Sequence, residues 1–292
     1  MTPGLSVVII THNSRERILA LLESLASDPA SEGWETVVLD NGSVDGTAAA
    51  VRERCPEVRV TENRPQRGFA GALNQGVAMT SAPAIVTVNP DAIVPTGSMG
   101  RLLRVLEQEP RIAAVGPLIR FPDGRVQRHG MYDPRPLTAA VVLLGLARLP
   151  MFRAEAERYY GRHEPGPPAD VDSLTGACLM FRRVAYREVG PFDERFFLYC
   201  EDVDWSLRAR SAGWRLVFVP DVHVVHEKAT ASRQQSSFVI RHYYRSLRAF
   251  YGKHHAPRQL APLRAAWYAA SYLLEGTTLV TDAIRADKGL RY

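Results

Sequence analysis

A continuous apolar run near the N-terminus constrains the fold of this chain more than any other feature. Residues 5–10 read Leu-Ser-Val-Val-Ile-Ile, and most of them are β-branched. A strand with one face in water would alternate polar and apolar residues, so this run indicates a strand buried on both faces of a parallel sheet. Helical periodicity follows at 15–26, and residues 36–39 form a second apolar run. The chain therefore begins with a strand–helix–strand unit, whose crossover should be right-handed.

The alternation of strands and helices continues along the chain and is typical of an α/β domain with a mixed, mostly parallel sheet flanked by helices. We expect further strands at 58–61, 84–88, 113–116, 171–182, 214–219 and 222–226, and helices at 48–54, 97–108, 184–189 and 203–212. Residues 121–168 are richer in Pro and Gly, with a hairpin at 121–126 and a helix at 137–152. Long irregular segments are often binding loops, so we expect acceptor contacts there.

Composition excludes several classes of protein. The net charge is +5, mostly from Arg, but no basic run is long enough to indicate a nucleic-acid partner. The three cysteines are widely spaced, without a metal-binding pattern, which favours a reduced, cytoplasmic setting. The N-terminus lacks the features of a signal peptide, and no uncharged apolar segment reaches the roughly 20 residues of a membrane span.

Polar residues follow three of the expected strands. Thr11, Asp40 and Asp91 each come directly after an apolar run or close behind it. In open α/β sheets, ligands bind beyond the carboxyl ends of the strands. These side chains therefore predict a binding site at one edge of the sheet, although an acid in such a position can also simply cap a turn.

The segment 64–76 contains three glycines at the start of an expected helix. Its N-terminal amides and Arg67 could meet an anion. The alternative is a helix that packs tightly through its small residues.

Residues 192–205 place five acids among eight apolar or aromatic residues. Carboxylates beside aromatic walls have the altered proton affinity that general acid/base chemistry requires. The alternative is an acidic helix start, in which the acids favour the positive end of the helix dipole. The two interpretations are compatible.

Eight short motifs occur in order over roughly residues 5–232 and together carry a resemblance to a known family. They lie at 7–13, 40–47, 68–76, 89–91, 175–178, 190–197, 201–205 and 225–227. With them the chain resembles the inverting glycosyltransferases of family 2, which have the GT-A (Rossmann-like) fold, and in particular their rhamnosyltransferase-like branch.

The resemblance implies a role for nine residues. Thr11, Asn13, Asp40, Arg67 and Asn89 would bind the nucleotide, with the Asp40 carboxylate accepting from the ring N–H of a pyrimidine. Asn89-Pro90-Asp91 occupies the DxD position, where Asn89 replaces the first acid. Asp91 and His226 would hold Mg²⁺ or Mn²⁺ on the donor diphosphate. Asp202 matches the general base, with Glu201 beside it, whereas Asp193, Glu194 and Asp204 would shape the structure.

The resemblance also implies the reaction and the partners. A sugar, rhamnose or a related deoxyhexose, would pass from a dTDP- or UDP-sugar to a hydroxyl of a glycan, lipid-linked or small-molecule acceptor, in cell-wall or polysaccharide biosynthesis. Two alternatives stay open. A sugar nucleotidyltransferase would need a Gly-rich, Lys-bearing N-terminal loop, which the chain lacks, and a non-catalytic nucleotide-sugar-binding protein would explain the missing first acid.

We expect a catalytic domain at 1–236, with a nucleotide-sugar half at 1–118 and an acceptor and base half at 119–236, followed by a helical extension at 237–292. The extension mixes Arg with aromatic residues. Its helices, the last at 263–284 as one helix or a pair, could pack on the catalytic domain, lie on the inner face of a membrane, or form a homodimer contact. We favour the first interpretation.

Overall fold

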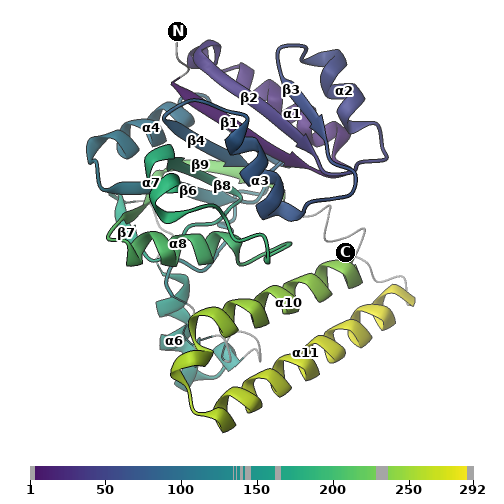
Figure 1. The fold of residues 1–292 in the computed structure, drawn as a ribbon, viewed down its shortest axis with the longest axis vertical. Coiled ribbons are helices and arrows are strands. Elements are labelled where there is room, and N and C mark those ends of the chain that lie inside the picture. Colours follow the sequence, from purple (N-terminus) through teal and green to yellow (C-terminus); the bar gives the residue numbers. More distant parts are fainter. Residues whose placement is uncertain are drawn as a thin grey trace.

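A mixed sheet with helices on both faces forms the body of the molecule, which we describe from a computed structural model (Figure 1). The structure describes residues 4–133, 135, 137, 138, 141, 146–161, 166–227 and 236–287. The helix expected at 137–152 lies partly outside these residues. Within them, a 3₁₀ turn covers Leu146–Arg148 and helix α6 covers Pro150–Tyr160.

The sheet has the strand order β3-β2-β1-β4-β8-β6-β9-β5, with β7 paired to β9. Strands β1 to β4 are parallel, as the apolar runs predicted, whereas β8 runs antiparallel to its neighbours β4 and β6. The strands are β1 (Leu5–Thr11), β2 (Trp34–Asp40), β3 (Arg59–Glu62), β4 (Ala84–Val88), β5 (Ala92–Ile93), β6 (Ile112–Arg120), β7 (Ala169–Val171), β8 (Cys178–Arg182) and β9 (Arg215–His226).

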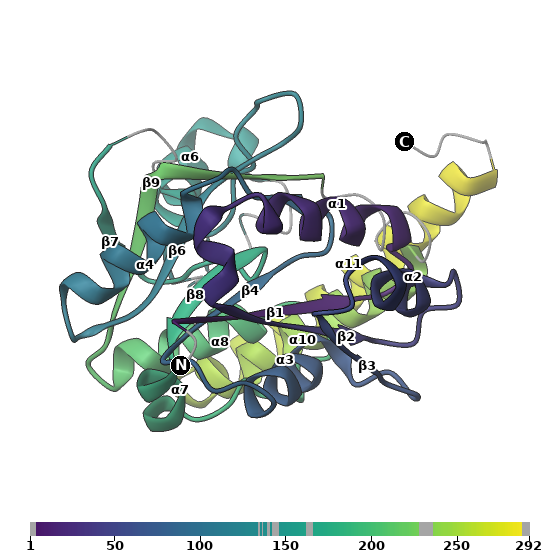
Figure 2. The same cartoon turned by 90° about the horizontal axis from the view of Figure 1, so that it is seen from above.

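Two apolar cores lie on opposite faces of the sheet. One contains residues of α1, α2 and α4, and the other contains residues of α3, α7 and α8. The helices that form these layers are α1 (Arg15–Ala26), α2 (Thr47–Arg54), α3 (Gly68–Ala78), α4 (Ser98–Gln108), α7 (Arg183–Val189) and α8 (Glu201–Ser211). Figure 2 shows α1 lying along one side of the sheet, with α3 and α8 on the other.

The structure corrects the sequence prediction for the last strands. The two strands expected at 214–219 and 222–226 are one strand, β9, because Pro220 and Asp221 do not break it. The register of β6 against β9 jumps between Pro117 and Leu118, from Val219 to His223. The proline therefore sits in an irregularity where no ladder N–H is needed. The expected strand at 171–182 is likewise two separate strands, β7 and β8.

The C-terminal helices α10 (Ser236–His254) and α11 (Ala261–Asp287) form a hairpin beside the sheet domain (Figure 1). Helix α10 packs on the segment before α8: Ser246 Oγ donates to the carbonyl of Leu198 at 2.8 Å, and the His242 ring stacks on Phe197. Helix α11 packs along α10 and lies on its far side from the sheet. The predicted C-terminal helical extension is therefore confirmed. No described helix is both long and apolar enough to cross a bilayer.

Candidate active site

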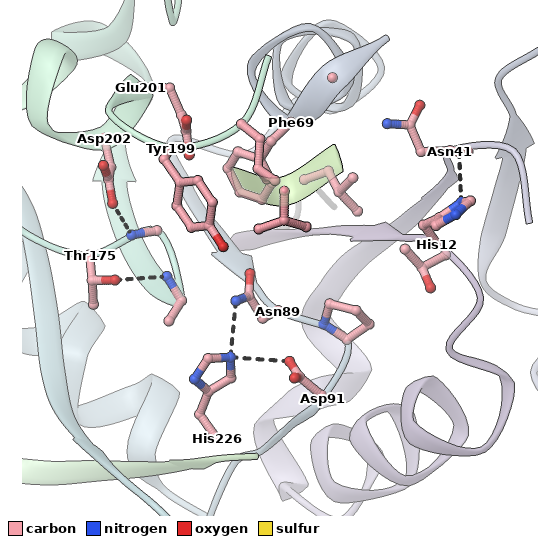
Figure 3. Close-up of a pocket in the computed structure, with 18 of the residues that line it drawn as sticks. His12, Asn41, Phe69, Asn89, Asp91, Thr175, Tyr199, Glu201, Asp202 and His226 are labelled. Atoms are coloured by element: carbon pink, nitrogen blue, oxygen red, sulfur yellow. Dashed lines mark hydrogen bonds and ion pairs between the residues drawn. The ribbon is translucent and has the colours of Figure 1, made fainter. Parts of the chain in front are cut away.

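A cavity of about 390 Å³ opens beyond the carboxyl ends of β1 and β4 (Figure 3). Its lining includes six of the nine residues that the sequence analysis selected: Thr11, Asn89, Asp91, Glu201, Asp202 and His226. Asn13, Asp40 and Arg67 are not among the lining residues. The polar groups at the sheet edge and the acids of α8, which are far apart in sequence, thus meet in one cavity.

Two parallel strands, β1 and β2, end at one side of the cavity, and of their last residues Thr11 belongs to the lining. Thr11 of β1 and Asp40 of β2 are partners in the strand register. Asp40 Oδ1 accepts from the Ser43 N–H at 2.7 Å, which closes the turn. Among the described residues, Asp40 Oδ2 and Thr11 Oγ1 are buried without a hydrogen-bond partner. Because buried polar atoms are rarely left unpaired, these two suit a ligand with complementary polar groups.

Asn13 and Arg67 shape the loops around this side. Asn13 Oδ1 accepts from the Val44 N–H at 2.9 Å and thereby holds the 40–47 turn. Arg67 is exposed, and its backbone N–H donates to Asn41 Oδ1 at 3.0 Å. In this arrangement neither side chain extends into the cavity wall.

The glycines of the 64–76 segment serve close packing. Gly68 has φ +73°, and a Cβ there would lie 2.8 Å from the Phe197 carbonyl oxygen. A Cβ on Gly76 would lie 2.4 Å from Val8 Cγ1. The Phe69 N–H, at the start of α3, donates to the Phe197 carbonyl at 2.8 Å. The geometry therefore favours the packing interpretation of this segment. The contacts of Gly68 and Phe69 with Phe197 join α3 to the segment that leads into α8.

Strand pairing brings Asp91 and His226 together. Ala92 of β5 is the partner of His226 in β9, so the preceding residue, Asp91, lies beside the imidazole. His226 Nε2 is 3.1 Å from Asp91 Oδ1 and 3.1 Å from Asn89 Nδ2. His226 Nδ1 is 2.7 Å from Gln127 Oε1, which can only accept, so we assign the ring proton to Nδ1. The lone pair of a neutral His226 is then on Nε2, on the side of Asp91.

Asp91 and His226 can hold a divalent cation only together with further ligands from outside the protein. Among the described residues there is no group of three or more His, Cys, Asp or Glu side chains placed for a metal. Asp91 and His226 supply one oxygen and one nitrogen donor, and Gln127 fixes the imidazole in the way that outer-shell partners of metal ligands do. The residues present therefore fit a metal whose remaining ligands come from a diphosphate and water.

Glu201 and Asp202 open helix α8 on another wall of the cavity (Figure 3). Asp202 Oδ2 accepts from the Gly176 N–H at 2.8 Å, and Oδ1 accepts from the Val203 N–H at 2.8 Å. Burial raises the pKa of Asp202, and these backbone hydrogen bonds partly oppose it. Burial, together with the negative charge of Asp202, raises the pKa of Glu201 well above its usual range. The pair should therefore ionise at Asp202 first.

The backbone before this pair is strained. Tyr199 and Cys200 both have positive φ, at 69° and 68°. Non-glycine residues pay on the order of 1–2 kcal/mol each for this conformation, and such strain gathers at functional sites. The two residues turn the chain sharply, so that α8 begins at Glu201 rather than at 203 as the sequence analysis expected. The acids thus lie in the first helical turn, where they also favour the helix dipole.

Asp193 and Asp204 serve the structure, as expected. Lys253 Nζ of α10 lies 2.6 Å from Asp204 Oδ1 and 2.8 Å from Asp193 Oδ2. His254 Nε2 is 2.7 Å from Asp204 Oδ1, and Arg208 Nε donates to Asp204 Oδ2 at 2.9 Å. These contacts fasten α10 to α8.

Comparison with known proteins identifies the family. A model of the family described as glycosyl transferase family 2 matches residues 6–190. The chain belongs to glycosyl transferase family 2. A model described as glycosyl transferase family group 2 also matches residues 161–283. The predicted family is confirmed, and the nucleotidyltransferase alternative does not fit it.

Relatives of this glycosyltransferase include rhamnosyltransferases. It is 32% identical to the N-acetylglucosaminyl-diphospho-decaprenol L-rhamnosyltransferase of Mycobacterium tuberculosis, over 99% of this chain and 96% of the relative. It is 26% identical to the rhamnosyltransferase WbbL of Escherichia coli, over 75% of this chain and 82% of that one. The resemblance to the rhamnosyltransferase branch is confirmed.

Solved structures confirm the fold. The mannosyltransferase PcManGT of Pyrobaculum calidifontis, in complex with GDP-Man and Mn²⁺, has a TM-score of 0.58 at 20% identity, over 98% of this chain and 76% of that one. TarS of S. aureus has a TM-score of 0.56 at 16% identity, over 94% and 71%. The enzyme therefore has the predicted GT-A architecture, a fold in which solved members carry a divalent metal.

Several cavity residues escaped the sequence analysis. Gln127 lies in the irregular segment and holds His226 through Oε1, while its Nε2 is buried without a partner among the described residues. No motif marked it. The Gly176 amide belongs to a recognised motif, but only the fold shows that it binds Asp202. His12 and Gln66 also line the cavity, and Nε2 of the Gln66 amide lies 3.2 Å from Nδ1 of the His12 ring.

Proposed function

We propose that this family 2 glycosyltransferase moves rhamnose or a related deoxyhexose from a dTDP- or UDP-sugar to a hydroxyl of a lipid-linked N-acetylglucosamine, with inversion. The observation that carries the proposal is that Asp202 and Asp91 lie on different walls of one cavity, with His226 beside Asp91 (Figure 3). A base and a diphosphate site on separate walls suit a single displacement between them.

Asp202 acts as the general base. Its carboxylate takes the proton from the acceptor hydroxyl while that oxygen attacks the anomeric carbon, and the bond from the sugar to the diphosphate breaks. The raised pKa of Asp202 makes it a better proton acceptor than an exposed aspartate. The backbone N–H groups of Gly176 and Val203 fix the direction of the carboxylate. No covalent intermediate is needed.

Asp91 and His226 would hold a divalent cation at the diphosphate end of the donor. When bound, such a cation would supply positive charge to offset the charge that gathers on the leaving diphosphate. Oxygen donors suit Mg²⁺, whereas the imidazole nitrogen shifts the preference toward Mn²⁺. The nucleobase of the donor would lie by Asp40 Oδ2 and Thr11 Oγ1, which are both buried and unpaired among the described residues. These two atoms suit the ring N–H and the carbonyl of a uracil or thymine.

The acceptor side of the cavity suits an amphiphile. Phe197, Leu198, Phe238 and Val239 contribute apolar surface to the same lining that holds Asp202. The relative from Mycobacterium tuberculosis, aligned over 99% of this chain, is named for a diphospho-decaprenol acceptor. Both observations support an acceptor whose sugar is carried on a polyprenyl diphosphate.

The test is transfer itself. The purified enzyme, with Mg²⁺ or Mn²⁺, should convert a polyprenyl-diphosphate-linked N-acetylglucosamine and dTDP-rhamnose or a UDP-sugar to a disaccharide lipid, and nuclear magnetic resonance should show the inverted anomeric configuration. Removal of the metal with EDTA should stop turnover, and adding it back should restore it. Donor binding without any transfer, or binding indifferent to metal, would support the alternative of a non-catalytic nucleotide-sugar-binding protein.

A further inference from the structure

In helix α11 the charged and apolar sides are arranged in the opposite way to those of an ordinary surface helix. Such a helix normally turns its charged residues to water and its apolar face to the protein. In residues 265–281 the one charged residue is Glu275, and it faces inward: it is 13% exposed and pairs with Arg248 of α10 at 2.8 Å. The outward positions in this stretch carry only apolar, small or hydroxyl side chains.

We define the outer face of α11 by the exposed residues Leu263, Ala266, Ala270, Leu273, Thr277 and Val280. Their spacing of three and four places them on one side of the helix. The three large members are strongly exposed, with Leu263 at 60%, Leu273 at 69% and Val280 at 59%. A contiguous exposed apolar stripe of this kind marks an interaction surface. In Figure 1 this helix is the outermost element of the hairpin, away from the sheet.

The charge of the hairpin shows what kind of partner fits. Residues 236–292 contain nine Lys and Arg but three Asp and Glu, a net charge of +6, which exceeds the +5 of the entire chain. Arg241 and Arg245 on α10 are exposed. Two copies joined through the outer face would bring two such segments together, which costs electrostatic energy, whereas an anionic bilayer attracts them.

We propose that the outer face of α11 docks on the surface of an anionic lipid bilayer. The apolar side chains enter the boundary between head groups and acyl chains, and the basic residues of the hairpin contact lipid phosphates. The same hairpin supplies Phe238 and Val239 to the cavity lining, so docking fixes the position of the cavity relative to the membrane surface. This last consequence rests on the proposed function, because it matters only for a lipid-linked acceptor.

Vesicle flotation tests the surface without any need for activity. The wild-type enzyme should float with vesicles of phosphatidylcholine and phosphatidylglycerol, and it should bind more weakly to vesicles of phosphatidylcholine alone. Raising the salt concentration should release the enzyme from the anionic vesicles. The variant Leu273→Glu/Val280→Glu should bind at least about tenfold less, because two apolar side chains that would enter the bilayer become charged. Both positions are exposed, so the variant should fold. A matched control, Met151→Glu/Val184→Glu, replaces exposed apolar residues elsewhere and should bind as the wild type does.

Two further measurements separate the outcomes. Light scattering should find a monomer; a wild-type dimer that Leu273→Glu/Val280→Glu converts to a monomer, with no vesicle binding, would overturn the proposal in favour of a second copy. Transfer to a short-chain soluble acceptor should be unchanged in this variant, while transfer to an acceptor embedded in vesicles should fall. If the wild type transfers sugar to neither acceptor, the proposed function fails. Flotation still tests independently whether the outer face of α11 binds the bilayer.

Discussion

Asp202 and Asp204 lie two residues apart in the first turn of α8, and their surroundings are opposite. Asp202 faces the cavity, where it accepts from two backbone N–H groups, and burial raises its pKa. Asp204 faces α10 and is fully buried. Burial acts to raise its pKa too, but hydrogen bonds from His254 and Lys253 and the charge of Arg208 outweigh burial and lower it. One helix turn thus holds a carboxylate suited to proton transfer and another suited to fixed charge.

The difference comes from tertiary contacts rather than from local sequence. Both aspartates follow a strained turn, and both are near the positive end of the helix dipole. Of the two, only Asp204 is in contact with basic side chains among the described residues, because α10 brings Lys253 and His254 to it. The helical extension therefore holds α8 and the segment before it. Among the described residues, the contacts of Asp202 are backbone N–H groups rather than cations.

Replacing Asp202 with Asn should have the largest effect on activity. The variant loses the proton acceptor, so transfer should fall about 10³-fold, in the range that general bases contribute. Donor affinity should change little, because the residues proposed to bind the donor lie on other walls of the cavity. Steady-state kinetics and donor titration calorimetry measure the two quantities. Near-normal turnover would remove Asp202 from the role of base.

Replacing Asp204 with Asn should instead lower stability. Loss of the buried charge leaves Lys253 and Arg208 without their main partner, and we expect the free energy of unfolding to drop by roughly 2 kcal/mol, less than for fully buried pairs because both cations are partly exposed. Urea unfolding measures it. Since the pKa of Asp204 is lowered, its stabilisation is present above the ordinary value of 3.8 and is lost as pH falls through the lowered pKa. Turnover per folded molecule should change little.

Replacing Lys253 with Met should cost less, about 1 kcal/mol. Arg208 and His254 still contact Asp204, and Arg195 still pairs with Asp193. The methionine keeps a long apolar side chain, but it removes the contact of Lys253 Nζ with the Phe196 ring, whose centre is 5.8 Å away. The same unfolding experiment applies, and a loss larger than that of the Asp204 variant would show that Lys253, rather than Asp204, is the centre of the network.

Much of the fold could be predicted from local pattern. The apolar runs at 5–10, 36–39 and 84–88 gave the correct parallel strands because buried strands have no polar alternation. The helix at 15–26 has the bounds that its periodicity predicted. Pro220 misled the strand assignment, because only the register of β6 against β9 shows that its position needs no hydrogen bond.

The candidate site was partly predictable for a different reason. Thr11, Asn89 and Asp91 end or follow strands of the same sheet edge, so their convergence follows from topology. His226 reaches Asp91 through the antiparallel pairing of β5 with β9. Strand β5 has only two residues, and no sequence pattern reveals it. The contacts of Gln127 with His226, of the Gly176 amide with Asp202, and of Lys253 and His254 with Asp204 join segments far apart in sequence. Local sequence carries no signal for them.

The pH profile of kcat/KM distinguishes the proposed general base, Asp202, from its neighbour Glu201. Because Asp202 must be ionised and its pKa is raised, kcat/KM should fall on acidification at a pH above the ordinary aspartate value of 3.8. Glu201, whose pKa is raised well above its usual range, should still be protonated at that point. Glu201→Gln mimics this neutral state, so the variant should keep kcat/KM within about threefold and leave the acid limb in place. Loss of activity in Glu201→Gln, or a marked shift of the acid limb, would contradict the account and assign the proton transfer to Glu201.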